Sequence, residues 1–403
     1  MSPSSAKELL IMNSPKLRFK NFNDEWKTFK IQDTFDNISI KNCPNMTILT
    51  IIQGHGTIPR NQSNRNIIFD EEKSRTYKMV NKKDFIIHLR SFEGGLEMSN
   101  HNGIVSPAYT IIRGKDIVIP LFFKYYFRTN KFINSILSKS VEGIRDGKQI
   151  SYNQLKDFYI PIPSIEEQTK IANFLSLIDR KIELQEKLVE NLKLYKKGLL
   201  QKVFSNNHGW KSAKLGDLGN TYTGLSGKSK EDFKNGNSKF ITYMNVFSNC
   251  ISNNQQLENI SINSNETQNK VKYGDIFFTT SSETPKEVGM SSVWLFNDDN
   301  IYLNSFCFGF RLNNITNFNI KFLAYLLRSY LIRKKIIFLA QGSTRYNISK
   351  NELMNLEILY PSIEEQNQIA NLFSNLDKKI DFETNRLTKL KEYKKGLLQQ
   401  MFI

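Results

Sequence analysis

Cysteine and histidine are scarce in this chain of 403 residues. The three cysteines, Cys43, Cys250 and Cys307, are too few and too far apart in the sequence for a disulfide framework or a zinc site. The four histidines have no cysteine or acidic neighbours at the spacing of metal ligands. We therefore expect no metal site, and the low cysteine content makes the cytoplasm the expected location.

The chain also lacks a long hydrophobic run, since no apolar stretch approaches about 18 residues. Its first residues, MSPSSAKELLIMNSPK, have neither the basic start nor the apolar middle of a signal peptide. Both absences argue against membrane insertion, and we expect residues 1–17 to form an N-terminal tail.

Sequence motifs of catalysis and cofactor binding are missing as well. No glycine-rich turn suited to a nucleotide or S-adenosylmethionine follows a strand-like run, and no Asn-Pro-Pro or Asp-Pro-Pro motif is present to grip a flipped base. GLSGKS, at residues 224–229, imitates a phosphate-binding loop, but Tyr222 stands where the first glycine is required. The pair Asp298 and Asp299 is most simply read as turn residues. We expect a binding protein without catalytic residues and without a cofactor of its own.

Acidic residues are outnumbered, 39 against 56 lysines and arginines, which gives a formal net charge of +17. The excess is spread over the chain and is not gathered in one tail. A nucleic acid is the natural counterpart, because cationic side chains that neutralise phosphates release condensed counterions. Some sequences rich in lysine and asparagine are basic without binding DNA, so charge alone leaves that alternative open.

The most informative feature that is present is an internal repeat. Residues 163–204 recur without a gap as residues 361–402, with 23 of 42 positions identical. Each copy begins with PSIEEQ, whose serine and second glutamate have the spacing of a capping box at a helix start. Each ends in YKKGLLQ, whose glycine fits either a C-cap or an interior position.

Apolar residues in both copies step by four and three positions in alternation, the spacing of a coiled-coil seam. The seam positions of the two copies are Ile171, Leu175, Ile178, Ile182, Gln185, Val189 and Leu192, then Ile369, Phe373, Leu376, Ile380, Glu383, Leu387 and Leu390. A helix of about 37 residues would be about 55 Å long. Two long amphipathic helices that simply pack in a core would give the same pattern, so that alternative stays open.

Two segments of domain size, residues 18–160 and 206–360, precede the two copies. They are weakly related, and both open on a Trp-Lys pair, at Trp26 and Trp210. One helix is expected near residues 320–338. Runs rich in β-branched and aromatic residues predict strands: FIIHLRSF, SPAYTIIR, DIVIPLFF, FITYMNVF, DIFFTT, SVWLF and FCFGFRL. We therefore predict two α+β domains.

The repeated PSIEEQ, IA, D-x-K-I and YKKGLLQ elements, with variable domains that open on Trp-Lys, resemble the specificity subunit of a Type I restriction-modification system. GIRDGKQIS at residues 143–151 and GSTRYNIS at residues 342–349 also resemble loops that end target-recognition domains in that family. The resemblance covers essentially the whole chain. It divides the chain into an N-terminal tail (1–17), target-recognition domain 1 (18–160), a central conserved helical spacer (161–205), target-recognition domain 2 (206–360) and a C-terminal conserved helical spacer (361–403).

The resemblance implies an α+β fold with two globular target-recognition domains separated by two long antiparallel coiled-coil helices, with pseudo-two-fold symmetry. Each domain would read one half of an asymmetric bipartite DNA site, and the helices would set the unread spacer. Two recognition surfaces about one DNA turn apart, roughly 34 Å, are within the span of such a helix.

The resemblance also implies partners. These are double-stranded DNA, two methyltransferase subunits that methylate adenine at N6 and two restriction subunits. S-adenosylmethionine, ATP and magnesium would be bound by those subunits and not by this chain. The repeated helix ends are the expected docking surfaces: Tyr195, Leu199, Leu200, Phe204, Tyr393, Leu397, Leu398 and Phe402. The apolar members of this set could instead close the core between the helices.

Candidate DNA contacts are polar and basic residues in loops beside the strand-like runs. They are Arg90, Ser91, Arg145 and Lys148 in the first domain, and Thr280, Ser281, Ser282, Lys286, Arg345 and Tyr346 in the second. Residues 89–91 and 280–282 rank first because they follow Asp84 and Asp275 at corresponding places. Arginine can read guanine through two hydrogen bonds, whereas each of these cations could equally hold a phosphate.

Two other classes of protein share some of these features. A free-standing DNA-binding or regulatory protein would share the charge and the duplication but would not need two partner-docking helices. A single-chain nuclease or methyltransferase would need catalytic motifs that the sequence lacks.

Overall fold

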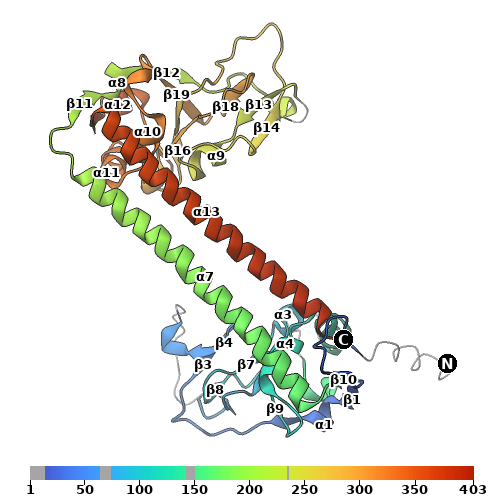
Figure 1. Ribbon diagram of the computed structural model, residues 1–403. Helices are drawn as coiled ribbons and strands as arrows, with labels where there is room; N and C mark the ends of the chain where they lie inside the picture. The colour runs from blue at the N-terminus through green and yellow to red at the C-terminus, as the bar shows by residue number, and fades with distance from the viewer. Residues whose placement is uncertain (1–13, 64–73, 142–149, 234–235) are drawn as a thin grey trace. The chain divides into compact units, whose positions relative to one another are not determined.

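The chain forms two compact units, and the boundary between them falls inside both long helices. Unit 1 contains the chain up to Glu186 and again Asn385–Ile403, whereas unit 2 contains Lys187–Thr384. The structure is a computed structural model that describes residues 14–63, 74–141, 150–233 and 236–403 (Figure 1).

The two repeat copies form two long helices, α7 (Ile165–Ser205) and α13 (Ile363–Gln400), each continuous from end to end (Figure 1). The predicted serine cap is present: Ser164 Oγ accepts a hydrogen bond from the backbone N–H of Glu167 at 3.2 Å, and the second copy repeats this bond at 3.3 Å. Both YKKGLLQ glycines are interior helix positions. None of the helices in the described residues is long and apolar enough to cross a membrane.

The two recognition domains have sheets of the same strand order, which confirms the predicted α+β class. In each four-stranded sheet all neighbouring strands are antiparallel. In domain 1 the order is β2 (Phe35–Ile38), β9 (Thr110–Gly114), β6 (Phe85–Ile87) and β7 (Glu97–Met98). In domain 2 it is β12 (Gly219–Thr223), β19 (Cys307–Leu312), β15 (Ile276–Thr279) and β17 (Ser291–Val293).

Smaller sheets complete both domains. The first and last strands of each domain pair antiparallel: β1 (Lys27–Lys30) with β10 (Tyr159–Ile162), and β11 (Lys211–Lys214) with β21 (Glu357–Tyr360). Domain 1 also has β3 (Leu49–Ile52) with β4 (Gly56–Pro59), and β5 (Lys78–Val80) with β8 (Gly103–Val105). Domain 2 has β14 (Leu257–Ile260), β13 (Ser238–Ile241) and β18 (Ile301–Leu303) in that order, and β16 (Ser281–Ser282) with β20 (Tyr346–Asn347).

Short helices connect the strands. In domain 1 they are α1 (Ile31–Thr34), α3 (Ser91–Gly94), α4 (Pro120–Tyr126), α5 (Asn130–Phe132) and α6 (Tyr152–Leu155). In domain 2 they are α8 (Leu215–Leu218), α9 (Tyr243–Ser248), α10 (Ile320–Leu327), α11 (Tyr330–Phe338) and α12 (Lys350–Met354).

Three local predictions were wrong in part. The strand-like run DIVIPLFF becomes helix α4 from Pro120 onward, because proline at the first helical position has the required φ and lacks an N–H that would be unpaired there. The run FITYMNVF is likewise divided, since β13 ends at Ile241 and α9 begins at Tyr243. The single helix expected near residues 320–338 is two helices, α10 and α11.

The core of unit 1 is aromatic and is completed by both long helices. Phe35 packs edge-on against Phe85 and Phe123, with ring centroids 5.9 and 5.1 Å apart. Helix α7 contributes Leu175 to this core, and the segment just after α13 contributes Phe402. The core of domain 1 therefore includes the last residues of the chain.

Unit 2 repeats this arrangement with the roles of the helices exchanged. Phe204, near the end of α7, stacks on Phe373 of α13 with ring centroids 6.2 Å apart. The same ring packs on Phe322 of domain 2 at 5.8 Å. Each recognition domain is thus packed on the start of the helix that follows it and on the end of the other helix.

The helices run antiparallel within each unit. In unit 1 Lys391 pairs with Glu186 and Lys394 pairs with Asp179, so residue numbers rise along α13 as they fall along α7. The contacts in unit 2 have the same sense. The predicted antiparallel pairing is confirmed.

A buried carboxylate anchors the entrance of domain 1. Glu167 accepts two hydrogen bonds from the guanidinium of Arg18, both 2.7 Å, and one from the indole of Trp26 at 3.2 Å. The carboxylate thus binds donors from the domain entrance. Leu17 N–H also donates to the carbonyl of Gln400 at 2.9 Å, so the end of the predicted tail is docked, while residues 1–13 lie outside the described residues.

Replacing Glu167 with alanine should lower the free energy of unfolding of unit 1 by about 3 kcal/mol, because it leaves the Arg18 guanidinium, whose side chain is only 13% exposed, without its counter-charge. Glu365→Ala is the matched control: the exposed Glu365 carboxylate accepts a hydrogen bond from the indole N–H of Trp210, and its loss should cost below about 1 kcal/mol. Urea unfolding followed by tryptophan fluorescence measures both. Equal losses for the two variants would contradict this assignment.

Candidate nucleic-acid interface

An aspartate and an arginine brace the sheet in each domain. The carboxylate of Asp84 accepts two hydrogen bonds from the guanidinium of Arg113, and Asp275 accepts two from Arg311, all at 2.7 Å. This bonding raises the pKa of both arginines above the ordinary value. Sequence analysis identified the aspartates but missed their partners, which lie 29 and 36 positions further along the chain.

The strand register makes the segments after the two aspartates equivalent. Phe85 in β6 and Ile276 in β15 each pair with the residue just before the bracing arginine. Residues 89–91 and 280–282 therefore follow matching strands at matching ends. The correspondence that ranked them first among the candidates is present in the structure.

In domain 1 the candidates divide between surface and interior. Arg90 is exposed, and its neighbour Leu89 is 48% exposed. Ser91 is fully buried, and its hydroxyl accepts a hydrogen bond from the backbone of His88 at 2.9 Å, so its proposed contact with DNA is wrong. Arg145 and Lys148 lie outside the described residues.

Domain 2 brings most of its candidates together. Strand β16 pairs Ser282 with Tyr346, and the backbone N–H of Ile348 donates to the carbonyl of Thr280 at 3.0 Å. The GSTRYNIS segment thus lies along residues 280–282. Arg345 is exposed at this place.

The serines of this segment are a second correction. Ser281 and Ser282 are buried in β16, so they do not present hydroxyls to a ligand. Thr280 donates its hydroxyl to the carbonyl of Phe306 at 2.8 Å and is half-buried, as is Tyr346. Lys286 is exposed but follows Glu283 and precedes Glu287, which weakens the local positive potential.

Large apolar side chains near residues 280–282 were not predicted from the sequence. Met244 is 58% and Phe306 is 56% exposed, and Tyr243 donates its hydroxyl to the carbonyl of Ser281 at 2.7 Å. Phe306 stands in an Asn-Ser-Phe loop, and an aromatic residue among turn residues was the signal that could have found it. We name Met244, Thr280, Phe306 and Arg345 the domain 2 surface.

The predicted docking residues fall into an exposed group, a buried group and a half-buried group. Tyr195 and Tyr393 are exposed on α7 and α13. Phe204, Leu397 and Phe402 are buried, because the recognition domains pack on the helix ends, and their assignment to a docking surface is wrong. The remaining three are half-buried against the same cores: Leu199, Leu200 and Leu398.

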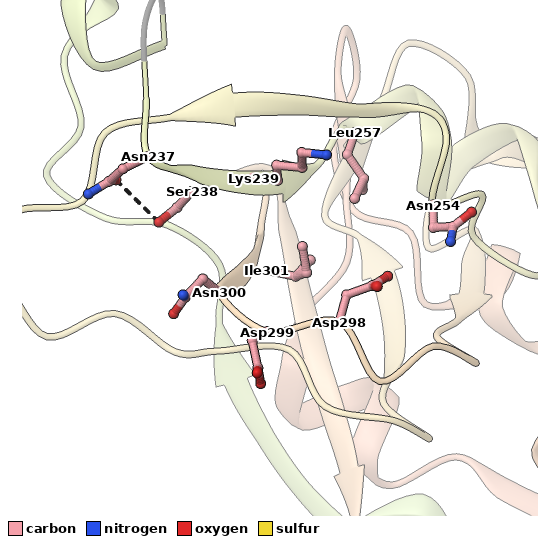
Figure 2. Close-up of a pocket in the computed structure, with 9 residues that line it drawn as sticks. All are labelled: Asn237, Ser238, Lys239, Asn254, Leu257, Asp298, Asp299, Asn300 and Ile301. Carbon is pink, nitrogen blue, oxygen red and sulfur yellow. Dashed lines mark hydrogen bonds between the residues drawn. The ribbon is translucent and has the colours of Figure 1, made fainter.

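A cavity of about 390 Å³ is lined by residues of β13, β14 and β18 and of the loops beside them. Figure 2 shows Asp298 and Asp299, on the loop before β18, and Lys239 on β13. Asp299 lies in a bend at residues 299–300, as predicted, whereas Asp298 comes just before the bend. Since two carboxylates in the lining would repel phosphate groups, we place no DNA contact in this cavity.

The described residues contain no group of three or more histidine, cysteine or acidic side chains placed to hold a metal ion. Burial raises the pKa of the Cys250 and Cys307 thiols, so these two are not activated nucleophiles. The domain 2 surface consists of a cation, a hydroxyl and exposed apolar groups. Such a surface can bind a polyanion and contact base edges.

Known proteins similar to this chain include specificity subunits of Type I restriction enzymes. The model of a family described as "Type I restriction modification DNA specificity domain" matches residues 23–194 and again residues 207–392. The Type I restriction enzyme MjaVIII specificity subunit of Methanocaldococcus jannaschii is 23% identical over 399 residues, which cover 93% of this chain and 91% of that protein.

Two solved structures share the fold. The S subunit of a Type-I restriction-modification system from M. genitalium superimposes with a TM-score of 0.53 at 17% identity, covering 97% of this chain and 99% of that one. The HsdS subunit from Thermoanaerobacter tengcongensis gives 0.51 at 17% identity, covering 94% and 96%.

Removing the charge of Arg345 should weaken binding to duplex DNA. If Arg345 neutralises one phosphate, the slope of log K against log salt becomes shallower by about one unit in Arg345→Ala. Fluorescence anisotropy with a labelled duplex at about 50 to 200 mM salt measures this slope. Lys197→Ala, which removes the same charge from an exposed position on α7, should leave the slope unchanged. Equal effects of the two variants would contradict the domain 2 surface.

Proposed function

Because this chain belongs to the Type I restriction modification DNA specificity domain family, we propose that its two units read the two halves of a divided DNA sequence. One observation carries this proposal. The two domains have the same strand order and the same register at the bracing arginine, yet the segments after the matching strands differ, Leu89-Arg90-Ser91 in one and Thr280-Ser281-Ser282 in the other. Equivalent scaffolds with different end groups are suited to two different half-sites.

The side chains at these ends suit contact with base edges. Arg90 in domain 1 and Arg345 in domain 2 can each donate two hydrogen bonds to guanine. In the domain 2 surface, Met244 and Phe306 leave large apolar side chains in solvent, and a thymine methyl group is the apolar feature of the major groove. We assign Met244 and Phe306 to base contact, and Arg90 and Arg345 to contact with a guanine edge and the phosphate beside it.

The outer faces of the long helices are the surfaces that we assign to protein partners. On α7, Leu177, Leu184 and Tyr195 are 68%, 58% and 60% exposed, and Tyr393 on α13 is 56% exposed. Large apolar groups on helices that already have a core favour a further protein contact. Two methyltransferase subunits, one for each repeat copy, fit the duplication.

The remaining roles follow from that assignment. This chain carries recognition and contributes no reacting group, so methylation of adenine at N6 and cleavage are assigned to the methyltransferase subunits and two restriction subunits. S-adenosylmethionine, ATP and magnesium are assigned to those partners as well. The proposed place of action is the cytoplasm, where the DNA and the partners are.

Expression of this chain with a Type I methyltransferase subunit should create one new methylated sequence in the cell. We expect two different half-sites, an unread spacer of fixed length and N6-methyladenine on both strands. Single-molecule sequencing of DNA from cells with and without this chain measures it. A confirmed complex that produces no new methylated motif would contradict the proposed function and favour a free-standing regulatory role.

A further inference from the structure

Four charged residues of the repeat have no part in the sites described above. Asp179 and Asp377 belong to the D-x-K-I stretch, and Lys196 and Lys394 are the first lysines of the two YKKGLLQ stretches. These residues are identical in the two copies, whereas much of the middle of the repeat differs. In the structure they meet in two clusters, one in each unit.

The cluster in unit 1 joins three elements. Asp179 on α7 accepts the hydroxyl of Tyr125 on Oδ2 at 2.9 Å and the ammonium of Lys394 on Oδ1 at 2.5 Å. Lys394 comes from the C-terminal part of α13, and its Nζ lies 5.6 Å from the centre of the Tyr125 ring. Tyr125 belongs to α4 of the recognition domain. One carboxylate thus holds the domain and both helices.

Unit 2 contains the same cluster with the helices exchanged. Asp377 on α13 accepts the hydroxyl of Tyr325 on α10 at 2.8 Å. Its other oxygen is bonded to Lys196 of α7, whose Nζ lies 5.2 Å from the centre of the Tyr325 ring. We name these two sets the tyrosine clusters.

The side chains of the tyrosine clusters are partly shielded from water, which strengthens the ion pair and restricts its geometry. The side chains of Asp179 and Lys394 are 29% and 24% exposed. Burial and the neighbouring aspartate raise the pKa of both tyrosines, which keeps each hydroxyl protonated and able to donate. A charged acceptor that binds two donors at fixed angles allows little displacement.

The apolar seam alone would not fix the register of two long helices. Seam residues recur every three or four positions, so a shift of one helix by a heptad replaces one apolar contact with another. A shift by a single residue moves a side chain by about 1.5 Å along the helix and turns it by about 100°. Either shift would separate Lys394 from Asp179. A single polar contact of this kind is known to select one register among several that are apolar.

We propose that the tyrosine clusters are positioning devices that hold each recognition domain and the two helices in one register, and thereby restrict this chain to one spacing between its half-sites. This inference rests on the proposed function. Each cluster acts on its own unit, and both are needed because each long helix carries the aspartate of one cluster and the lysine of the other.

The domain is attached to its own helix by a second contact, which the lysine of the tyrosine cluster does not make. Gln168 of α7 accepts from the N–H of Ile119 at 2.8 Å and donates to the carbonyl of Ile117 at 2.9 Å, so the domain is already attached to its own helix. Gln366 repeats this attachment in unit 2. Within a tyrosine cluster, it is the lysine that connects the aspartate to the opposite helix.

The test is Asp179→Asn in the full chain, expressed with a Type I methyltransferase subunit and read by single-molecule methylation sequencing. The amide keeps the shape but loses the charge that binds Lys394. We expect both half-sites unchanged, with methylation spreading to sites whose spacer is longer or shorter than in the wild type. The preference for one spacer should fall roughly tenfold, which corresponds to about 1.4 kcal/mol. Asp377→Asn should do the same from the other unit.

Two further variants separate positioning from stability. Leu175→Ala removes a fully buried side chain of the same helix and should lower stability while keeping a single spacer. The double variant Asp179→Lys with Lys394→Asp restores the ion pair with its charges exchanged and should recover much of the preference for one spacer. This double variant still tests the inference if Asp179→Asn alone fails to assemble with the methyltransferase subunit.

The outcomes are distinguishable. One unchanged spacer in both asparagine variants would overturn this inference and leave the proposed function standing, as would equal broadening in Leu175→Ala. A wild-type complex without a divided motif would overturn the proposed function and this inference together.

Discussion

The C-terminal end of each long helix packs into the core that contains the start of the other helix, and the fold depends on this packing. Phe402 packs on Phe122 of domain 1 with ring centroids 5.2 Å apart, and Phe204 packs on Phe322 of domain 2. Domain 1 therefore lacks part of its core until the last residues of the chain are present. Contacts of such long sequence separation are slow to form and couple the two halves of the sequence during folding.

This constraint separates what is constant in the chain from what varies. The repeat copies share 23 of 42 positions, and the shared residues include the serine caps, the domain-binding glutamines and both tyrosine-cluster charges. The domains share strand order and a bracing Asp-Arg pair but little sequence. Different side chains can thus occupy the strand ends while the contacts that hold each domain to the helices stay the same.

Features with a local physical cause were predicted from the sequence. The capping serines, the apolar seam and the α+β class depend on residues a few positions apart, and all are present. Leu397 and Phe402 were misassigned to a docking surface because their burial depends on domain 1, at the other end of the chain. Ser281 and Ser282 look like exposed loop residues in the sequence and are buried because β20 pairs with them. Arg113 was missed for the same reason, since its partner Asp84 lies just before another strand, β6.

Native-state hydrogen exchange along the two helices can show whether each helix is divided between two cores. In rising sub-denaturing urea, we expect residues 165–186 to lose protection together with residues 385–400, and residues 187–205 to do so together with residues 363–384. Protection would then follow the units and change partway along each helix. If α7 opened as one whole and α13 as another, the division of each helix between two cores would be contradicted.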